Sequence, residues 1–387
     1  MRSFPIPGLL GVIVLILLGC ANVVASPSPI EAGASSSPSL ILSPTPASGS
    51  NSWFNDVSCN SQTICMAVGT RSQKKGPTAL AELWNGRSWS ITGSSEKLNV
   101  GLGGISCPGA TFCIAVGSVG PPATAQPLAE MWNGSGWTAS RVPLPSGTDI
   151  SLNSVSCSSS HACVAVGQYY TSIRFTFSEI WNGTKWHLVA TDNPSTVVNS
   201  LVNVSCTSAH VCRAVGYDAS GQGAPQPLVE SWSGGAWSVS PTPILPNPIP
   251  DGPPRSGILT GVSCTLATAC VAVGYASAPG DTTLVESWNG SVWSISPSPN
   301  PDSVASELIG VSCTNANFCL AVGTESNNQT SWSTLAELWN GAAWTAIPSA
   351  NPGALDNSLV RVSCPTPTTC QSVGSTSDAT LAESESS

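Results

Sequence analysis

The cysteines of this 387-residue chain have the most regular spacing of any residues that could do chemistry. Fourteen of the fifteen form seven pairs, and the two members of each pair are six positions apart. Zinc sites usually combine C-x2-C spacing with further Cys or His ligands, whereas this chain has only three histidines. Disulfides persist in exported proteins, so we predict seven of them: Cys59–Cys65, Cys107–Cys113, Cys157–Cys163, Cys206–Cys212, Cys264–Cys270, Cys313–Cys319 and Cys364–Cys370.

The fifteenth cysteine follows a short apolar run near the amino terminus. The segment Leu17-Leu18-Gly19-Cys20 resembles the lipobox of bacterial lipoproteins, in which signal peptidase II cuts before a cysteine that becomes lipidated. The resemblance implies a signal peptide over residues 1–19 and a lipid anchor on Cys20 at the extracellular face of the bacterial cell membrane. A Ser/Pro/Ala-rich tether over residues 20–38 follows. The alternative is an ordinary signal cut after Ala25, which would give a secreted protein.

The remaining titratable residues do not form a catalytic pattern. Histidines 161 and 210 occupy matching places in two cysteine loops where other loops carry Thr or Asn, which favours an exposed polar position over a metal site. No G-x-S-x-G motif and no local Ser-His-Asp arrangement is present. A glutamate repeated in every unit indicates a structural role with hydrogen bonds to the carboxylate: Glu82, Glu130, Glu179, Glu230, Glu286, Glu337 and Glu383. We therefore predict no catalytic residue, no metal and no cofactor.

These residues belong to seven repeated units with a period near 49 residues. Each unit contains the frame [VI]-S-C-x5-C-x-[AS]-V-G, which predicts a hairpin that places the two cysteines within disulfide range. A second frame, L-[AV]-E-x-W-N-G-x-x-W, predicts another hairpin, because Asn-Gly tolerates the backbone angles of tight turns. Each unit thus has four short antiparallel strands, a to d: VSC, CxAVG, LAExW and WSxSP. With 36 Gly and 32 Pro in the chain, long helices are excluded.

Four-stranded units repeated seven times predict an all-β fold, a seven-bladed β-propeller of antiparallel blades over residues 39–387. A linear β-solenoid is the alternative. The last unit ends at Ser387 without its strand d, while residues 39–46 ahead of the first unit match that strand. We therefore expect an N-terminal strand to close the ring. Closure would make Asp56 and Arg361 neighbours, and a solvated ion pair there would contribute ~0 to 1 kcal/mol.

The repeat also carries a resemblance to known proteins. The run from Leu284 to Trp293, LVESWNGSVW, followed by Asn300-Pro301, looks like the repeats of a family of secreted bacterial propeller proteins, mostly uncharacterised. The likeness covers residues 40–387 and implies the propeller architecture. It is more distantly similar to kelch-type and sialidase-type propellers, whose shared fold hosts many functions and transfers none.

The composition excludes one class of function, and the loop sequences indicate where a ligand would bind. Charged residues are 9% of the chain and its net charge is −9, which excludes a basic surface for nucleic acid. We expect a monomeric, surface-tethered binding or interaction propeller without catalytic chemistry, its partner an extracellular protein or glycan. The alternative is a carbohydrate-active hydrolase or lyase that uses loop residues. The b–c and d–a connections differ most between units, so we predict the ligand face there, with aromatic candidates Tyr169, Tyr170, Phe175, Tyr217, Tyr275 and Trp332.

Overall fold

The computed structural model describes residues 38–46, 51–93, 99–121, 123–219, 223–246, 255–277, 280–301, 304–328, 330–353, 355–377 and 379–386. The stretch from Ser37 to Ser387 is one compact unit. Cys20, the predicted signal peptide and nearly all of the predicted tether lie outside the described residues. Part of the proline-rich stretch 241–254, which lengthens the interval between units four and five, does so too.

The described residues form 28 β-strands, four for each repeat unit, and no helix. Strands of units one to three are β2 (Ser52–Ser61), β3 (Ile64–Arg71), β4 (Thr78–Trp84), β5 (Trp89–Ile91), β6 (Val100–Gly109), β7 (Phe112–Val119), β8 (Gln126–Trp132), β9 (Trp137–Ser140), β10 (Thr148–Ser159), β11 (Ala162–Tyr170), β12 (Arg174–Trp181) and β13 (Trp186–Ala190). Those of units four and five are β14 (Val198–Ser208), β15 (Val211–Ala219), β16 (Gln226–Trp232), β17 (Trp237–Val239), β18 (Ser256–Leu266), β19 (Ala269–Ser277), β20 (Asp281–Trp288) and β21 (Trp293–Ile295). Units six and seven contain β22 (Ala305–Asn315), β23 (Phe318–Ser326), β24 (Ser333–Trp339), β25 (Trp344–Ala346), β26 (Ser358–Thr366), β27 (Thr369–Ser375), β28 (Thr380–Ser386) and β1 (Ser39–Leu42). No helix in this part of the chain is therefore long and apolar enough to cross a membrane.

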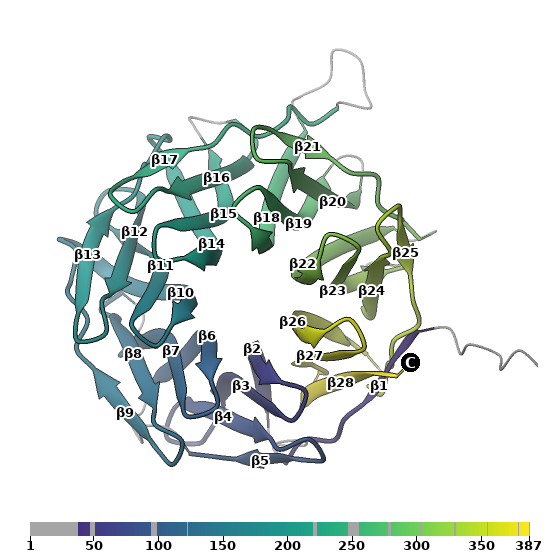
Figure 1. Ribbon diagram of the computed structural model, residues 1–387, viewed down its shortest axis with the longest axis horizontal. Helices are drawn as coiled ribbons and strands as arrows, with labels where there is room; N and C mark the ends of the chain where they lie inside the picture. Colours follow the sequence, from purple (N-terminus) through teal and green to yellow (C-terminus); the bar gives the residue numbers. More distant parts are fainter. Residues whose placement is uncertain are drawn as a thin grey trace, which may run out of the picture. The chain divides into compact units, whose positions relative to one another are not determined.

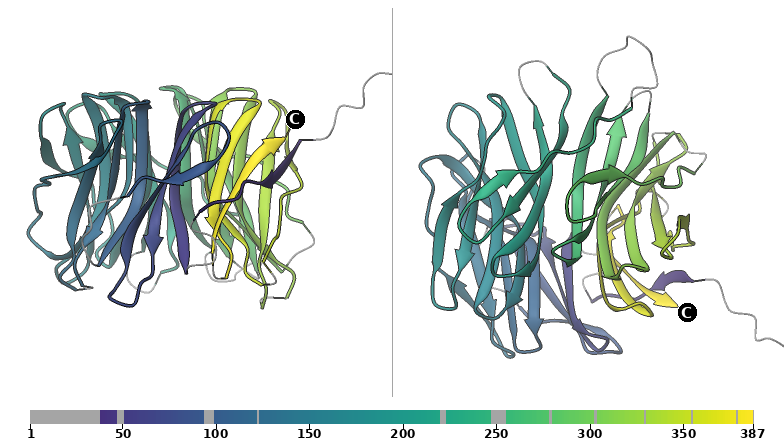
Figure 2. Two further views of the ribbon diagram at one scale, coloured as in Figure 1. Left: turned by 90° about the horizontal axis from the view of Figure 1, so that it is seen from below. Right: turned by 45° about the horizontal axis from the view of Figure 1, so that its top comes forward.

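The strands form antiparallel sheets arranged around a common axis (Figure 1). Five sheets have four strands, and one has eight, made of two antiparallel halves joined by the single parallel pair Arg174 and Val198. Strand a of each unit lies nearest the axis and strand d lies outermost, and Figure 2 shows the strands of the sheets running roughly along that axis. The four predicted strands per unit are confirmed, including the edge position of the proline-flanked strand d.

The two ends of the repeat array meet in one sheet. Strand β1 pairs antiparallel with β28, so the prediction that an N-terminal strand completes the last unit is confirmed. Arg361 Nε lies 4.0 Å from Asp56 Oδ1, which also confirms the predicted contact between units seven and one. The value for a solvated pair does not apply, because the side chains of Arg361 and Asp56 are only 13% and 11% exposed. Packing from both neighbouring units covers them.

The repeated serine of the VSC strand explains how neighbouring units join. In every unit its Oγ accepts a hydrogen bond of 2.9–3.0 Å from the backbone N–H of the first cysteine in the next unit. The series passes from Ser58 to Cys107 and onward, and its last member joins Cys59 N to Ser363 Oγ. Each bond satisfies an N–H that the sheet of its own unit leaves unpaired, at about 1 kcal/mol apiece.

The other repeated residues stabilise the hairpins. All seven predicted disulfides are present, within single hairpins. In the W-N-G turn of unit one, Asn85 Oδ1 accepts hydrogen bonds from the N–H groups of Arg87 and Ser88, and the two tryptophans pack with ring centroids 5.6 Å apart. The glycine of AVG permits close approach of strand a: a Cβ at Gly69 would lie 2.0 Å from the Trp53 carbonyl oxygen.

Candidate functional site

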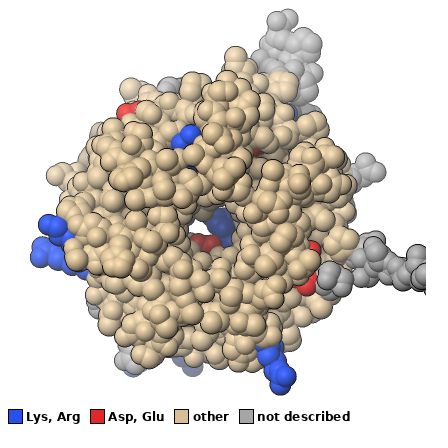
Figure 3. All heavy atoms as spheres, in the orientation of Figure 1, with Lys and Arg blue, Asp and Glu red and all other residues tan. Residues whose placement is uncertain are grey.

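The two kinds of connection lie at opposite ends of the sheets. The W-N-G turn packs on the cysteine loop of its own unit: a Cβ at Gly86 would lie 2.9 Å from Thr63 Cγ2, and Trp339 Nε1 donates a 3.0 Å hydrogen bond to the Ala316 carbonyl. We call this the turn end. Because the strands alternate in direction, the b–c and d–a connections lie at the other end, the connection end. The turn end faces the viewer in Figure 3. Its surface is mostly uncharged, with a few charged residues, most of them near the rim or within the opening at its centre.

The structure divides the six predicted aromatic residues into two groups. Tyr169 and Phe175 are cross-strand partners whose rings stack at 5.5 Å, and Tyr169 also contacts Phe177 of the core between units two and three. Successive side chains on a strand point to opposite faces, so Tyr170 faces unit four instead. Tyr169 therefore serves packing between units, and Phe175 packs against it within its own unit. Tyr170, Tyr217, Tyr275 and Trp332 are the candidates that remain for binding.

Tyr170 and Tyr217 are joined through an arginine that the sequence analysis did not select. Arg174, at the start of β12, donates from Nε to Tyr170 Oη at 2.7 Å and from Nη1 to Tyr217 Oη at 3.1 Å. Tyr217 comes from β15 of the next unit, directly after the glycine of its AVG motif. The three side chains therefore form a polar, aromatic cluster across units three and four at the connection end.

A second cluster lies beside it in units five and six. Tyr275 occupies the same repeat position as Tyr217, and burial, with nearby Glu307 and Asp281, raises the pKa of its phenol above the ordinary value. Burial and the neighbouring Asp281 carboxyl raise the pKa of Glu307 to about 7. Neither acid occupies a repeated position, so the sequence offered no signal for this pair.

Glu307 also lines a cavity of about 370 Å³ between units six and seven. Trp332 and Asp356 form further parts of its wall, and five Ser or Thr residues complete it. The loop that carries Asp356 is fixed by a 2.8 Å hydrogen bond from Asn357 N to the Trp332 carbonyl. The cavity lies within the range of small-ligand sites, and it contains the fourth retained aromatic candidate.

The repeated glutamates of strand c lie inside the protein, and three of them have hydrogen bonds that join neighbouring units. All seven side chains are fully buried. Glu230, Glu337 and Glu383 each accept a hydrogen bond from the preceding unit, given by Asp192 N, Ser298 Oγ and Ala350 N respectively. Both carboxylate oxygens of Glu179 and Glu286 have no hydrogen-bond partner. Burial raises the pKa to about 8 in Glu179, Glu230, Glu286 and Glu383, so these four are mainly protonated at neutral pH.

All three histidines are exposed. His161 and His210 are exposed and line one groove of about 230 Å³ between units three and four. His187, for which the sequence suggested no partner, has Nε2 at 2.9 Å from Asn182 Nδ2. No group of three or more His, Cys, Asp or Glu residues that could hold a metal occurs among the described residues.

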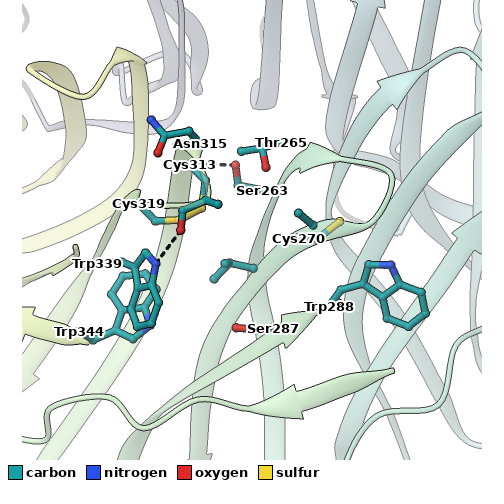
Figure 4. A pocket seen from close by; sticks show the side chains of 13 residues that line it. Ser263, Thr265, Cys270, Ser287, Trp288, Cys313, Asn315, Cys319, Trp339 and Trp344 are labelled. Atoms are coloured by element: carbon teal, nitrogen blue, oxygen red, sulfur yellow. Dashed lines mark hydrogen bonds between the residues drawn. A yellow bond between two sulfur atoms is a disulfide. The ribbon is translucent and has the colours of Figure 1, made fainter. Parts of the chain in front are cut away.

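A second groove at the turn end lies between units five and six (Figure 4). It encloses about 200 Å³ between Trp288 on one wall and Trp339 and Trp344 on the other, with the Cys313–Cys319 disulfide beside them. The groove between units three and four has matching members in Trp181 and Trp232. All ligand candidates predicted from the sequence lie at the connection end, and no prediction placed a groove among the repeated residues.

Comparisons with known proteins define the class of fold. No protein-family model matches the sequence, and no curated protein is similar to it. Similar solved structures include YCF48 bound to D1 peptide (TM-score 0.51, 13% identity, 89% of this chain and 96% of that one). A second is the COPII outer coat vertex on membranes (TM-score 0.55, 9% identity, 87% of this chain and 84% of that one). A third is an ulvan lyase of polysaccharide lyase family PL25 bound to -[GlcA(1-4)Rha3S]- (TM-score 0.52, 10% identity, 87% of this chain and 94% of that one). At these identities the likeness establishes a propeller-like, all-β fold and no activity.

Proposed function

We propose that this chain is a seven-bladed β-propeller that binds an extracellular partner at its connection end and performs no reaction of its own. Seven blades follow if the two antiparallel halves of the eight-stranded sheet count as separate blades. The cyclic series of serine-to-cysteine hydrogen bonds supports this count, because the seventh bond returns to the first unit. A scaffold joined in this way would hold its loops in fixed positions around the axis.

The contact that carries the proposal is the one between Arg174 and the hydroxyls of Tyr170 and Tyr217. Tyr and Arg are the residues most enriched where protein partners bind, because they combine a large rigid surface with hydrogen bonding. Tyr275 and Trp332 extend the same end of the molecule toward units five to seven. Two of the similar solved structures, YCF48 with its D1 peptide and the COPII coat, are by their titles a peptide complex and a protein assembly, which agrees with this proposal.

A surface location completes the proposal. Cys20 would carry the lipid, and the Ser/Pro/Ala-rich segment behind it would separate the propeller from the membrane of a bacterial cell. Replacing Cys20 with Ser is expected to release the protein from membranes into the soluble fraction. Membrane retention of Cys20→Ser would contradict lipidation while leaving the binding proposal intact.

The carbohydrate-active alternative is less well supported, although the pKa of Glu307, raised to about 7, lies in the range that acid–base chemistry uses. Glycoside hydrolysis needs two carboxyl groups about 5 to 9.5 Å apart, with the bond to be cleaved between them. A hydrogen-bonded pair is closer than that. Since the two acids contact each other, we assign them to shaping the connection end.

The decisive experiment screens the purified protein on peptide and glycan arrays and against chromogenic glycosides. We expect binding without turnover, and we expect Tyr217→Ala and Tyr275→Ala each to weaken binding at least tenfold. Arg87→Val and Ser291→Ala, on exposed turns at the opposite end, are the matched controls and should bind like the wild type. Loss of binding confined to these two controls would contradict the choice of the connection end, and turnover abolished by Glu307→Gln would establish the enzymatic alternative.

A further inference from the structure

The strand-b residue that follows the second cysteine is apolar in units one to three, five and six, but unit four has Arg213 there. Its guanidinium lies over the ring of Trp288 in unit five, 5.0 Å from the ring centroid. Nη1 donates one hydrogen bond, at 3.2 Å, to the Cys212 carbonyl, and Nε is buried without a partner. A guanidinium has five N–H donors, and among the described residues the Cys212 carbonyl is the one hydrogen-bond acceptor that Arg213 has.

Arg213 forms no ion pair with any described residue. The single ion pair found in the described part of the chain joins Arg361 to Asp56, at a different junction. Burial lowers the pKa of the Arg213 guanidinium below its ordinary value, and no carboxylate counteracts that shift. Arg213 is partly buried, so its charge has lost part of its hydration without gaining a counterion. An anion that reached the guanidinium would recover part of that free energy.

The surroundings of Arg213 identify what else such an anion would contact. Trp288 separates the guanidinium from the apolar groove between units five and six, because the same indole lines that groove. Valines occupy the repeat position of Arg213 in the two grooves. Val271 lines the groove between units five and six, and Val164 lines the groove between units three and four. Arg213 therefore places one cation beside a hollow of about 200 Å³ lined by Trp288, Trp339 and Trp344.

We propose that Arg213 and the groove between units five and six form a second binding site, for an acidic peptide segment of a partner protein. A carboxylate of the segment pairs with the guanidinium of Arg213 from the solvent side, and a neighbouring apolar side chain enters the groove beside Trp288. Arg213 supplies the charge complementarity, since planar guanidinium groups bind carboxylates through two parallel hydrogen bonds. This site lies at the turn end and does not depend on the function proposed for the connection end.

The test measures binding of two small probes that differ only in charge. Nα-acetylleucine has a carboxylate next to an apolar side chain, and Nα-acetylleucinamide has the same side chain without the charge. By isothermal titration calorimetry we expect the acid to bind the wild-type protein at least tenfold more tightly than the amide. The Arg213→Val variant should bind the acid and the amide with about equal affinity. Valine is the native residue at this position in units three and five, so the variant should fold.

Two controls make the result specific. Arg87→Val removes an exposed arginine from the same end and should keep the tenfold preference. Glucuronate, which has a carboxylate without an apolar side chain, should bind at least tenfold more weakly than Nα-acetylleucine. Equal affinity for acid and amide in the wild type, failure of both to bind, or an unchanged preference in Arg213→Val would overturn the charge assignment. Glucuronate binding as tight as that of Nα-acetylleucine would overturn the peptide assignment.

Discussion

Arg361 and Asp56 contact each other across the junction of the last and first units, 305 residues apart in the sequence, with 4.0 Å between Nε and Oδ1. Asp56 connects three units at once, because Oδ2 also accepts a 2.8 Å hydrogen bond from Ile105 N in unit two. Elsewhere the same repeat position has a polar neutral residue, such as Asn203, or glycine. Among the described residues, the buried ion pair therefore occurs at the junction between the last and first units.

Removing one charge of this pair should be costly. Asp56→Asn retains an oxygen that accepts a hydrogen bond but leaves Arg361 buried without a counterion, so we expect a loss of about 3 kcal/mol in the free energy of unfolding. Urea denaturation measures the loss. The double variant Asp56→Asn with Arg361→Gln should recover a large part of it. If Asp56→Asn is as stable as the wild type, the contact has no role in joining the two ends.

Deleting strand β1 should have a larger effect than deleting the tether. Without residues 39–46, strand β28 loses its outer partner and exposes unpaired backbone groups at the edge of the last sheet. We expect a lower melting temperature, or self-association in size-exclusion chromatography. Deletion of residues 22–34, a longer segment, is the control and should change neither the melting temperature nor the association state. The same behaviour in both deletions would show that β1 is dispensable.

Stability should fall with rising pH because of the buried strand-c glutamates. In the folded protein the pKa of Glu179 and Glu286 is about 8 because burial disfavours the charged form, against an ordinary value of 4.5. The unfolded chain therefore releases protons first, and stability is lost between about pH 4.5 and pH 8. Urea denaturation at pH 5 and pH 8 measures the change. Glu179→Gln with Glu286→Gln should reduce the slope, and an unchanged slope would mean that these groups are charged in the fold.

Removing any one of the serine-to-cysteine hydrogen bonds between units should lower the free energy of unfolding. Ser363→Ala leaves the Cys59 N–H without its acceptor and should lower the free energy of unfolding by about 1 kcal/mol. Ser263→Ala, between units five and six, removes the equivalent acceptor of Cys313 N and is the matched variant. Thermal denaturation compares the two. A cost at Ser263 without one at Ser363 would indicate that units seven and one separate easily.

Much of this protein was determined by local sequence. The cysteine spacing, the Asn-Gly turns and the alternating strands fix structure within some fifteen residues, so the hairpins and all seven disulfides could be predicted. The missing fourth strand of the last unit even located β1, because a repeat makes a distant match visible. The repeat thus allowed the pairing of β1 with β28, which are far apart in the sequence, to be predicted from the sequence alone.

Only the tertiary structure decided what the unrepeated residues do. The direction in which Tyr169 and Tyr170 point depends on strand register, which divided neighbouring residues between the core and the connection end. Asp281 with Glu307, and Arg213 with Trp288, come from different units and meet only after the sheets assemble around the axis. Their burial, and therefore their charge, arises from packing between sheets that no local pattern in the sequence encodes.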